Sequence, residues 1–220
     1  MSLWIKICGN TSLADAQLAA DAGAAALGFV FAPSPRRVTL AQAAAIIPHL
    51  PASIEKIGVF VDASFDEIAS TVEACSLTGV QLHFAAPPSL PAELRARFGA
   101  ALRLIQVVHF DGSLAPAAFE LARNPSIDAI LVDSRTATAA GGTGQTFDWL
   151  AASKSLFQNA KAPERLIAAG GLTPENVAQA IDLLHPWGVD AVSGVEASPG
   201  RKDPAKVRAF TAHARAAAGK

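Results

Sequence analysis

Cys8 is the residue of this chain whose position is best suited to acid–base or nucleophilic chemistry. Residues 3–8 alternate in the period-two pattern of a β-strand, and Cys8 ends that run. Ser12, followed by Asp15, predicts a capped helix shortly afterwards. Unpaired N–H groups at the start of that helix, together with Lys6 on the same strand face, would favour a thiolate over a thiol. The alternative interpretation is a small buried hydrophobic residue, the usual role of a free cysteine.

The composition predicts a globular protein with a small-molecule partner. The 220 residues are 51% hydrophobic and 17% charged, which suits one large core and argues against disorder. Eighteen Lys and Arg residues against 19 Asp and Glu give a net charge of −1, so neither nucleic acid nor a membrane is an expected partner. Two cysteines, Cys8 and Cys75, predict a reducing, cytoplasmic compartment rather than a disulfide framework. No spacing of zinc ligands occurs.

Strand-like apolar segments alternate with alanine-rich amphipathic segments along the whole chain. This alternation predicts βαβ units and a parallel sheet. Eight such units in 220 residues predict a single-domain (β/α)8 barrel, a TIM barrel, over residues 1–220. A doubly wound open sheet is the competing fold, but no G-x-G-x-x-G follows the first strand. Strands are expected at 3–8, 25–31, 55–61, 79–83, 102–108, 128–133, 165–169 and 189–193, and helices at 13–22, 39–49, 64–75, 89–98, 113–123, 146–157, 174–184 and 203–218.

In such a barrel, binding and catalytic residues follow the carboxyl ends of the strands. Backbone N–H groups of Gly171, Ser193 and Gly194 would cradle an anion, and this fold commonly holds phosphate after its seventh and eighth strands. A tight turn alone is the alternative interpretation of the glycines. The polar residues and glycines at these ends are Cys8, Arg36, Gln81, His83, Asp133, Gly170, Gly171, Ser193 and Gly194.

Short motifs follow one another in a fixed order along the chain. They are Lys6-Ile7-Cys8-Gly9, Gly28-Phe29-Val30-Phe31, Ser34-Pro35-Arg36, Gly58-Val59-Phe60-Val61, Gly79-Val80-Gln81-Leu82-His83, Leu131-Val132-Asp133-Ser134, Gly141-Gly142-Thr143-Gly144, Gly170-Gly171-Leu172-Thr173-Pro174 and Ser193-Gly194-Val195-Glu196. In order and spacing they resemble the phosphoribosylanthranilate isomerases of tryptophan biosynthesis. The resemblance implies a small (β/α)8 barrel that converts N-(5-phosphoribosyl)anthranilate into 1-(2-carboxyphenylamino)-1-deoxyribulose 5-phosphate by an Amadori rearrangement, with no metal or organic cofactor.

The resemblance also implies which residues carry the reaction. Asp133 corresponds to the general acid, which protonates the furanose oxygen so that the ring opens to a Schiff base. Cys8 corresponds to the general base, which removes the C2 proton of the iminium. Without the resemblance, Asp133 could equally be a helix cap or an ion-pair partner of Lys6.

Further residues are expected to bind the substrate. Arg36 matches the arginine that the family uses against the anthranilate carboxylate, with Arg37 as the alternative. Gly142 lies in a loop, residues 141–144, that resembles a mobile loop of the family; its closure would add N–H contacts to the phosphate. Gln81 and His83 share a strand face and are both expected at the barrel mouth, where His83 is expected to form hydrogen bonds rather than to catalyse.

Lys6 presents a separate problem, because a lysine inside a barrel needs a carboxylate. Three side chains could supply one, namely Asp133, Asp190 and Glu196.

Two alternative functions are considered. A histidine-pathway ribosyl isomerase performs the same rearrangement on a different amine, but it uses an aspartate where this chain has Cys8. A non-catalytic phosphate-binding barrel would keep the phosphate cradle and lose the acid–base pair. In each case the expected partner is a small phosphorylated molecule, and the protein is expected to be a monomer or a homodimer.

Overall fold

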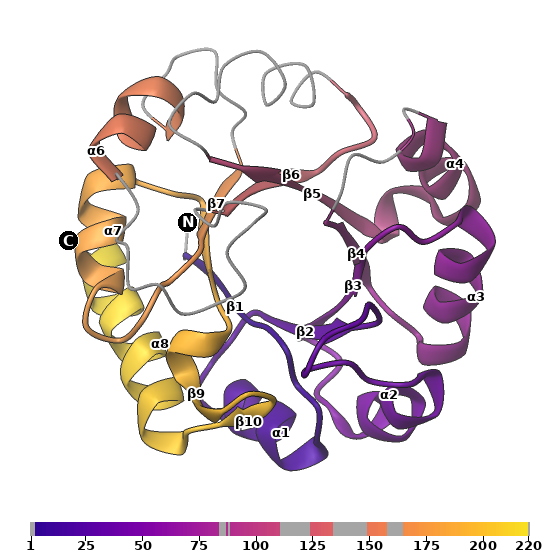
Figure 1. Cartoon of the computed structure of the whole chain (residues 1–220), viewed down its shortest axis with the longest axis horizontal. Helices are drawn as coiled ribbons and strands as arrows, with labels where there is room; N and C mark the ends of the chain where they lie inside the picture. Colours follow the sequence, from indigo (N-terminus) through magenta and orange to yellow (C-terminus); the bar gives the residue numbers. More distant parts are fainter. Residues whose placement is uncertain are drawn as a thin grey trace.

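The computed structural model describes residues 3–83, 87, 89–110, 124–133, 149–157 and 165–219, and its strands close into a parallel barrel (Figure 1). The strands pair in chain order, and the last one returns to pair with the first. The (β/α)8 barrel is therefore confirmed. The barrel strands are β1 (Trp4–Ile7), β2 (Ala26–Val30), β3 (Glu55–Phe60), β4 (Gly79–Leu82), β5 (Arg103–His109), β6 (Ala129–Asp133), β7 (Leu166–Ala169) and β8 (Gly188–Ala191).

Helices surround the barrel and connect its strands (Figure 1). The expected helix at 113–123 lies outside the described residues, as do residues 146–148 of the expected helix at 146–157. No helix in the described part of the chain is long and apolar enough to cross a membrane. The helices are α1 (Leu13–Asp21), α2 (Leu40–Ile46) with η1 (Ile47–His49), α3 (Phe65–Cys75), α4 (Ser89–Phe98) with η2 (Gly99–Ala101), α6 (Trp149–Ala152) with η3 (Ser153–Phe157), α7 (Val177–Leu184), η4 (Ser193–Val195) and α8 (Pro204–Ala218).

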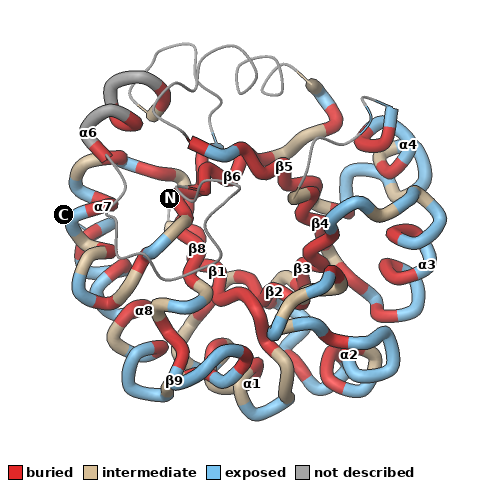
Figure 2. The backbone as a smooth tube through the Cα atoms, viewed as in Figure 1, coloured by how far each residue is buried: buried red, intermediate tan, exposed pale blue. Residues whose placement is uncertain are grey.

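Alternate residues of each strand face the barrel interior and the surrounding helices. Inside, Trp4, Leu131 and Ile167 belong to one apolar cluster, whereas Ile5 and Ile7 belong to the larger cluster that includes helix residues. A period of two therefore turns Trp4, Lys6 and Cys8 inward along β1. The strands are almost wholly buried, while the exposed residues gather on the outer faces of the helices (Figure 2).

A buried ion pair joins the first strand to the last. Lys6 is 0% exposed, and its Nζ lies 3.0 Å from Oδ1 of the buried Asp190. The two residues are direct partners in the β1–β8 register. Asp190 is therefore the partner of Lys6 among the three carboxylates that the sequence allowed. An ion pair of Lys6 with Asp133 or with Glu196, which the sequence left open, is not the one that forms. Burial acts to lower the pKa of Lys6, but the neighbouring Asp190 carboxylate and the Cys8 side chain together outweigh it, so this pKa lies above its ordinary value and the lysine stays charged.

The β1–β8 pair gives a stability prediction. Replacing Lys6 by Met leaves Asp190 buried without a cation, so we expect the free energy of unfolding to fall by about 3–5 kcal/mol. Urea denaturation followed by circular dichroism measures this loss. Because the pKa of Lys6 is raised above 10.5, its stabilisation is complete below pH 10.5 and is lost as the pH rises through the value of the folded state. The difference between wild type and variant should therefore shrink at strongly alkaline pH.

The double variant Lys6→Met/Asp190→Asn is the control, because it also removes the unpaired negative charge. We expect it to recover a large part of the lost stability. A single variant as stable as the wild type would contradict the importance of the pair.

Candidate active site

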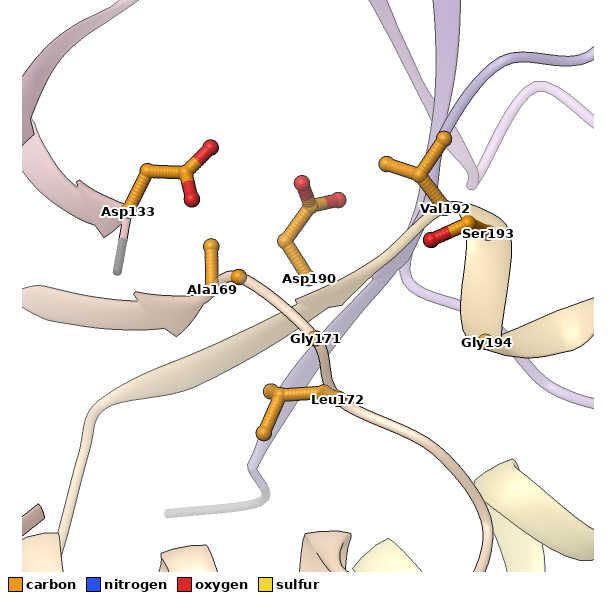
Figure 3. Close-up of a pocket in the computed structure, with 9 residues that line it drawn as sticks. Asp133, Ala169, Gly171, Leu172, Asp190, Val192, Ser193 and Gly194 are labelled. Atoms are coloured by element: carbon orange, nitrogen blue, oxygen red, sulfur yellow. The ribbon is translucent and has the colours of Figure 1, made fainter. Parts of the chain in front are cut away.

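Two adjoining cavities open at the carboxyl ends of the strands. The larger encloses about 680 Å³, including space open to solvent, and is lined by residues of β1, β2, β3, β4, β6 and β8 or of the segments that follow them. The smaller encloses about 280 Å³, again including open space, and lies among β6, β7, β8 and the loops after β7 and β8 (Figure 3). Asp133, Asp190 and Val192 line both cavities. A ligand could therefore extend from one into the other.

Cys8 and Asp133 line the same cavity although they come from opposite sides of the barrel. Cys8 follows β1 and is 4% exposed, and Asp133 ends β6 and is 3% exposed. Between these strands lie β2 to β5 on one side of the ring and β7 and β8 on the other (Figure 1). A thiol and a carboxyl group that face one cavity can remove and donate protons on a single bound molecule.

The position of Cys8 depends on a glycine in the neighbouring strand. A Cβ atom on Gly28 would lie 2.4 Å from Cys8 Sγ and 3.0 Å from Cys8 Cα, closer than atoms pack. Asn10 joins the same two strands, because its side-chain nitrogen donates to the carbonyl oxygens of Ile7 at 2.8 Å and Gly28 at 3.1 Å. The Cys8 N–H in turn donates to the Ala191 carbonyl at 2.9 Å. The thiol is therefore held from both neighbouring strands.

Arg36 also lines the larger cavity, whereas the exposed Arg37 does not. The Arg36 guanidinium is 18% exposed and is held by the buried Glu196. Its Nε donates to Oε1 at 2.9 Å and to Oε2 at 3.1 Å, and its Nη2 donates to Oε2 at 2.7 Å. This bidentate pair uses one edge of the guanidinium. The edge that includes Nη1 forms no hydrogen bond within the described residues.

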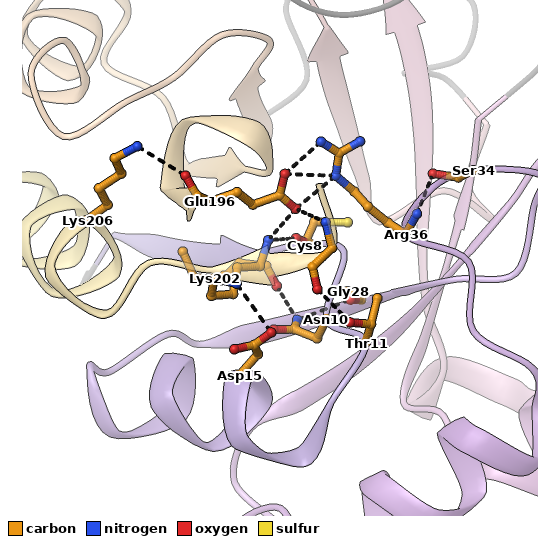
Figure 4. A network of polar contacts seen from close by, with 12 residues as sticks. Cys8, Asn10, Thr11, Asp15, Gly28, Ser34, Arg36, Glu196, Lys202 and Lys206 are labelled. Carbon is orange, nitrogen blue, oxygen red and sulfur yellow. Dashed lines mark hydrogen bonds and ion pairs between the residues drawn. The ribbon is translucent and has the colours of Figure 1, made fainter. Parts of the chain in front are cut away.

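Glu196 and Lys202 form a polar network that the sequence analysis did not assign. They are cross-strand partners in the small antiparallel sheet of β9 (Glu196–Ser198) and β10 (Arg201–Lys202). Lys202 Nζ donates to the Cys8 carbonyl at 2.5 Å and lies 3.3 Å from Glu196 Oε1 (Figure 4). The Gly200 N–H donates to the same carboxylate oxygen at 3.2 Å. The turn-forming Pro199-Gly200 was the available signal that these side chains face each other.

The network also binds the first helix. Ser12 caps α1 as expected and accepts from the Asp15 N–H at 3.1 Å. The Asp15 carboxylate, expected to complete a capping box, instead accepts from the Lys202 N–H at 3.2 Å. The β9–β10 sheet is thereby fixed against the segment that follows Cys8.

The charges in this network shift two pKa values. Burial acts to raise the pKa of Glu196, but the hydrogen bond from Arg36 and the charge of Lys202 outweigh it, so this pKa is lowered and the carboxylate stays ionised. Burial lowers the pKa of Lys202, and the Glu196 and Cys8 side chains offset this only in part. Lys202 is thus a cation held in a dry site by its neighbours.

Gln81 and His83 line the larger cavity, where the sequence placed them. Gln81 is buried, and its Oε1 has no hydrogen-bond partner among the described residues. A buried carbonyl oxygen without a hydrogen bond lowers the stability of the fold. A ligand in the cavity that Gln81 lines could supply this hydrogen bond. The half-buried His83 packs edge-on against His109, with ring centroids 5.4 Å apart.

The three residues that were expected to cradle an anion line the smaller cavity. Gly171, Ser193 and Gly194 all line it (Figure 3). A Cβ atom on Gly194 would lie 2.0 Å from the Leu172 carbonyl oxygen, so only glycine lets the loops after β7 and β8 pack this closely. Gly142, expected to close over this region, lies outside the described residues. Among the residues that the structure describes, no group of three or more His, Cys, Asp or Glu side chains could hold a metal ion.

Comparisons with known proteins agree on one family. The family described as N-(5'phosphoribosyl)anthranilate (PRA) isomerase matches residues 5–213. An N-(5'-phosphoribosyl)anthranilate isomerase of Pelobacter propionicus is 46% identical over 207 residues, covering 94% of this chain and 92% of the relative. The solved phosphoribosyl anthranilate isomerase of Thermotoga maritima superimposes with a TM-score of 0.84 at 34% identity, covering 97% and 99% of the two chains. A further solved isomerase, in complex with reduced 1-(o-carboxyphenylamino)-1-deoxyribulose 5-phosphate, gives 0.80 at 32% identity with the same coverage.

The contact between Gly28 and Cys8 gives a second prediction. The added methyl group of Gly28→Ala must displace the sulfur or the backbone of Cys8, so we expect a loss of about 1–3 kcal/mol in the free energy of unfolding. Urea denaturation measures the loss. Gly219→Ala is the matched control, because its new Cβ atom meets no atom closer than 3.5 Å. Equal stabilities of the two variants would show that the close contact has no effect.

Proposed function

The chain belongs to the N-(5'-phosphoribosyl)anthranilate isomerase family, and we propose that Cys8 and Asp133 perform its reaction as general base and general acid. The protein is an isomerase that catalyses the Amadori rearrangement of N-(5-phosphoribosyl)anthranilate to 1-(2-carboxyphenylamino)-1-deoxyribulose 5-phosphate, a step of tryptophan biosynthesis. The observation that supports the two roles is that both side chains line one cavity from opposite sides of the barrel.

Asp133 acts first in this proposal. Its carboxyl group donates a proton to the furanose ring oxygen, the bond between that oxygen and C1 breaks, and the nitrogen lone pair forms a cationic C=N bond. Asp133 is itself 3% exposed at the end of β6, so its carboxyl group meets the substrate with little contact with bulk water.

Cys8 acts second. As a thiolate it removes the C2 proton, the electrons of the C–H bond form a C1=C2 double bond, and the π electrons of the cationic C=N bond move onto nitrogen to give an enolamine. The enolamine then tautomerises to the product ketone. The proton leaves carbon for sulfur, and the cationic nitrogen receives the electron pair, so the step needs no external oxidant or reductant.

Arg36 binds the anthranilate carboxylate in this proposal. One edge of its guanidinium is already fixed on Glu196, so the edge that includes Nη1 is held ready for a second carboxylate. Gln81 presents a buried oxygen that has no partner among the described residues and therefore accepts a hydrogen bond from a sugar hydroxyl. His83 contributes a hydrogen bond near the same wall of the cavity.

The phosphate group occupies the smaller cavity. Gly171, Ser193 and Gly194 line this cavity, and their backbone N–H groups would suit an anion there. Lys6 offsets the charge of the neighbouring Asp190, which reduces its repulsion of the phosphate. Gly142 is proposed to close over the phosphate as part of its loop.

The two alternative functions agree less well with these observations. A non-catalytic phosphate-binding barrel does not require a thiol and a carboxyl group in one cavity. A histidine-pathway isomerase is not the family that the chain matches.

We propose that the whole chain, residues 1–220, acts as one catalytic domain in the cytoplasm. The free state of both Cys8 and Cys75 supports the cytoplasmic compartment. Light scattering would distinguish the expected monomer from the expected homodimer.

The acid and base roles give a third prediction. Cys8→Ser and Asp133→Asn should each lower kcat by at least about 10²-fold, because each removes one proton-transfer group. The loss of substrate fluorescence, with phosphoribosylanthranilate generated in situ, measures turnover. Cys75→Ser, which alters the other buried thiol, is the control and should keep near wild-type activity. Full turnover in Cys8→Ser or in Asp133→Asn would refute the role assigned to that residue.

Arg36 gives a fourth prediction. Arg36→Lys keeps the charge but loses the planar fork, so we expect KM to rise about tenfold or more while kcat changes less. Steady-state kinetics with the same assay separates the two constants. Arg37→Lys should leave both unchanged. If Arg37→Lys raised KM and Arg36→Lys did not, the assignment of the two arginines would be reversed.

A further inference from the structure

The mechanism above uses Glu196 only to hold one edge of Arg36 and makes no use of Lys202, although both residues are buried beside the proposed base and the carboxylate-binding arginine. Charged side chains are rarely buried without a role or a partner. Lys202 contacts the residue that carries the proposed base, and Glu196 contacts the arginine that carries the proposed carboxylate site (Figure 4). The two are joined to each other by their own ion pair.

We propose that Glu196 and Lys202 are positioning residues that connect Arg36 to Cys8 through one buried network of charged side chains. This inference rests on the proposed function, because it assigns roles through the base and the carboxylate-binding arginine. In this network Lys202 fixes the backbone of Cys8 and supplies positive charge that favours the Cys8 thiolate. Glu196 fixes the guanidinium of Arg36 and keeps Lys202 charged.

The contact between Lys202 and Cys8 is direct. The Lys202 ammonium donates to the Cys8 carbonyl oxygen at 2.5 Å. Its charge is therefore bound to the same residue that carries the thiol. The charge of Cys8 also acts back on Lys202, since it is among the influences that raise the pKa of this lysine against the effect of burial. In a dry site such a cation acts strongly on a nearby thiol. Lys6 supplies a second cation from β1, where Asp190 already neutralises it.

The contact between Glu196 and Arg36 determines the orientation of the guanidinium. Three hydrogen bonds of 2.7 to 3.1 Å hold the Nε–Nη2 edge in the plane of the carboxylate. The same carboxylate accepts from the Gly200 N–H and pairs with Lys202, so it is itself fixed. A preoriented arginine loses less conformational entropy when the substrate binds. Glu196 should therefore affect KM more than kcat.

The charged groups around Cys8 come from several elements. Lys202 is the one among them that donates to the Cys8 backbone and is replaced in the test below. The charged or titratable groups that line the cavity with Cys8 or join its network are Lys6, Asp15, Arg36, His83, Asp133, Asp190, Glu196, Lys202 and Lys206.

The first experiment measures the reactivity of Cys8 without substrate. Carboxamidomethylation by iodoacetamide is followed over a pH series, and the peptide that contains Cys8 is quantified by mass spectrometry. In Lys202→Met we expect the midpoint of the rate profile to move up by about one pH unit, and kcat to fall about tenfold or more. Lys202→Arg keeps the charge and should restore most of both values.

The matched control is Lys56→Met. Lys56 is also buried, its Nζ also donates to a backbone carbonyl, that of Pro51 at 2.6 Å, and burial lowers its pKa too. It does not line either cavity. Its replacement should leave the alkylation profile and kcat unchanged. A wild-type profile in Lys202→Met, or an equal shift in Lys56→Met, would overturn the proposal.

Glu196→Gln tests the other part of the proposal, the contact between Glu196 and Arg36. This test does not depend on whether Lys202→Met folds. We expect KM to rise about tenfold, with a smaller change in kcat. An unchanged KM would overturn the role of Glu196. Because alkylation needs no substrate, it tests Lys202 even where full turnover of Cys8→Ser would refute the proposed function.

Discussion

The ion pair between Lys6 and Asp190 is the interaction on which the site depends most. It lies at the junction where the barrel closes, because β1 and β8 meet in a register that places the two residues side by side. Two residues beyond each of them along their strands come Cys8 and Val192, both of which line the larger cavity. A one-residue shift of this register would turn β1 over and send the thiol toward the helices. The register between β1 and β8 thus determines both how the barrel closes and where the proposed base lies.

The same period of two places the other reacting groups. Asp133 follows Leu131 on the inward face of β6, and His83 follows Gln81 on β4. The barrel presents polar groups at its carboxyl end simply because the inward-facing positions change there from apolar to polar residues. The interior below remains a packed apolar cluster.

Much of this arrangement could be predicted from the sequence. The alternation of strand-like apolar segments with amphipathic segments placed all eight barrel strands, and the position of Cys8 and Asp133 at the ends of strands placed both at one end of the barrel. The partner of Lys6 could not be predicted, because the choice among three carboxylates depends on the register between the two ends of the chain. The roles of Glu196 and Lys202 were missed for another reason. Strands of two and three residues are too short to show a period, and only the turn at Gly200 marked them.

The β9–β10 sheet also affects how the protein is made. The thiol is specified by the eighth residue, whereas the side chains that surround it with charge are specified by residues 196 and 202 of 220. During synthesis on the ribosome, the N-terminal strand therefore emerges long before the C-terminal segment that completes its surroundings. A nascent or prematurely terminated chain carries its cysteine without Lys202, Glu196 or the closing strand. Chemical competence thus appears only when residues 196–202 have left the ribosome.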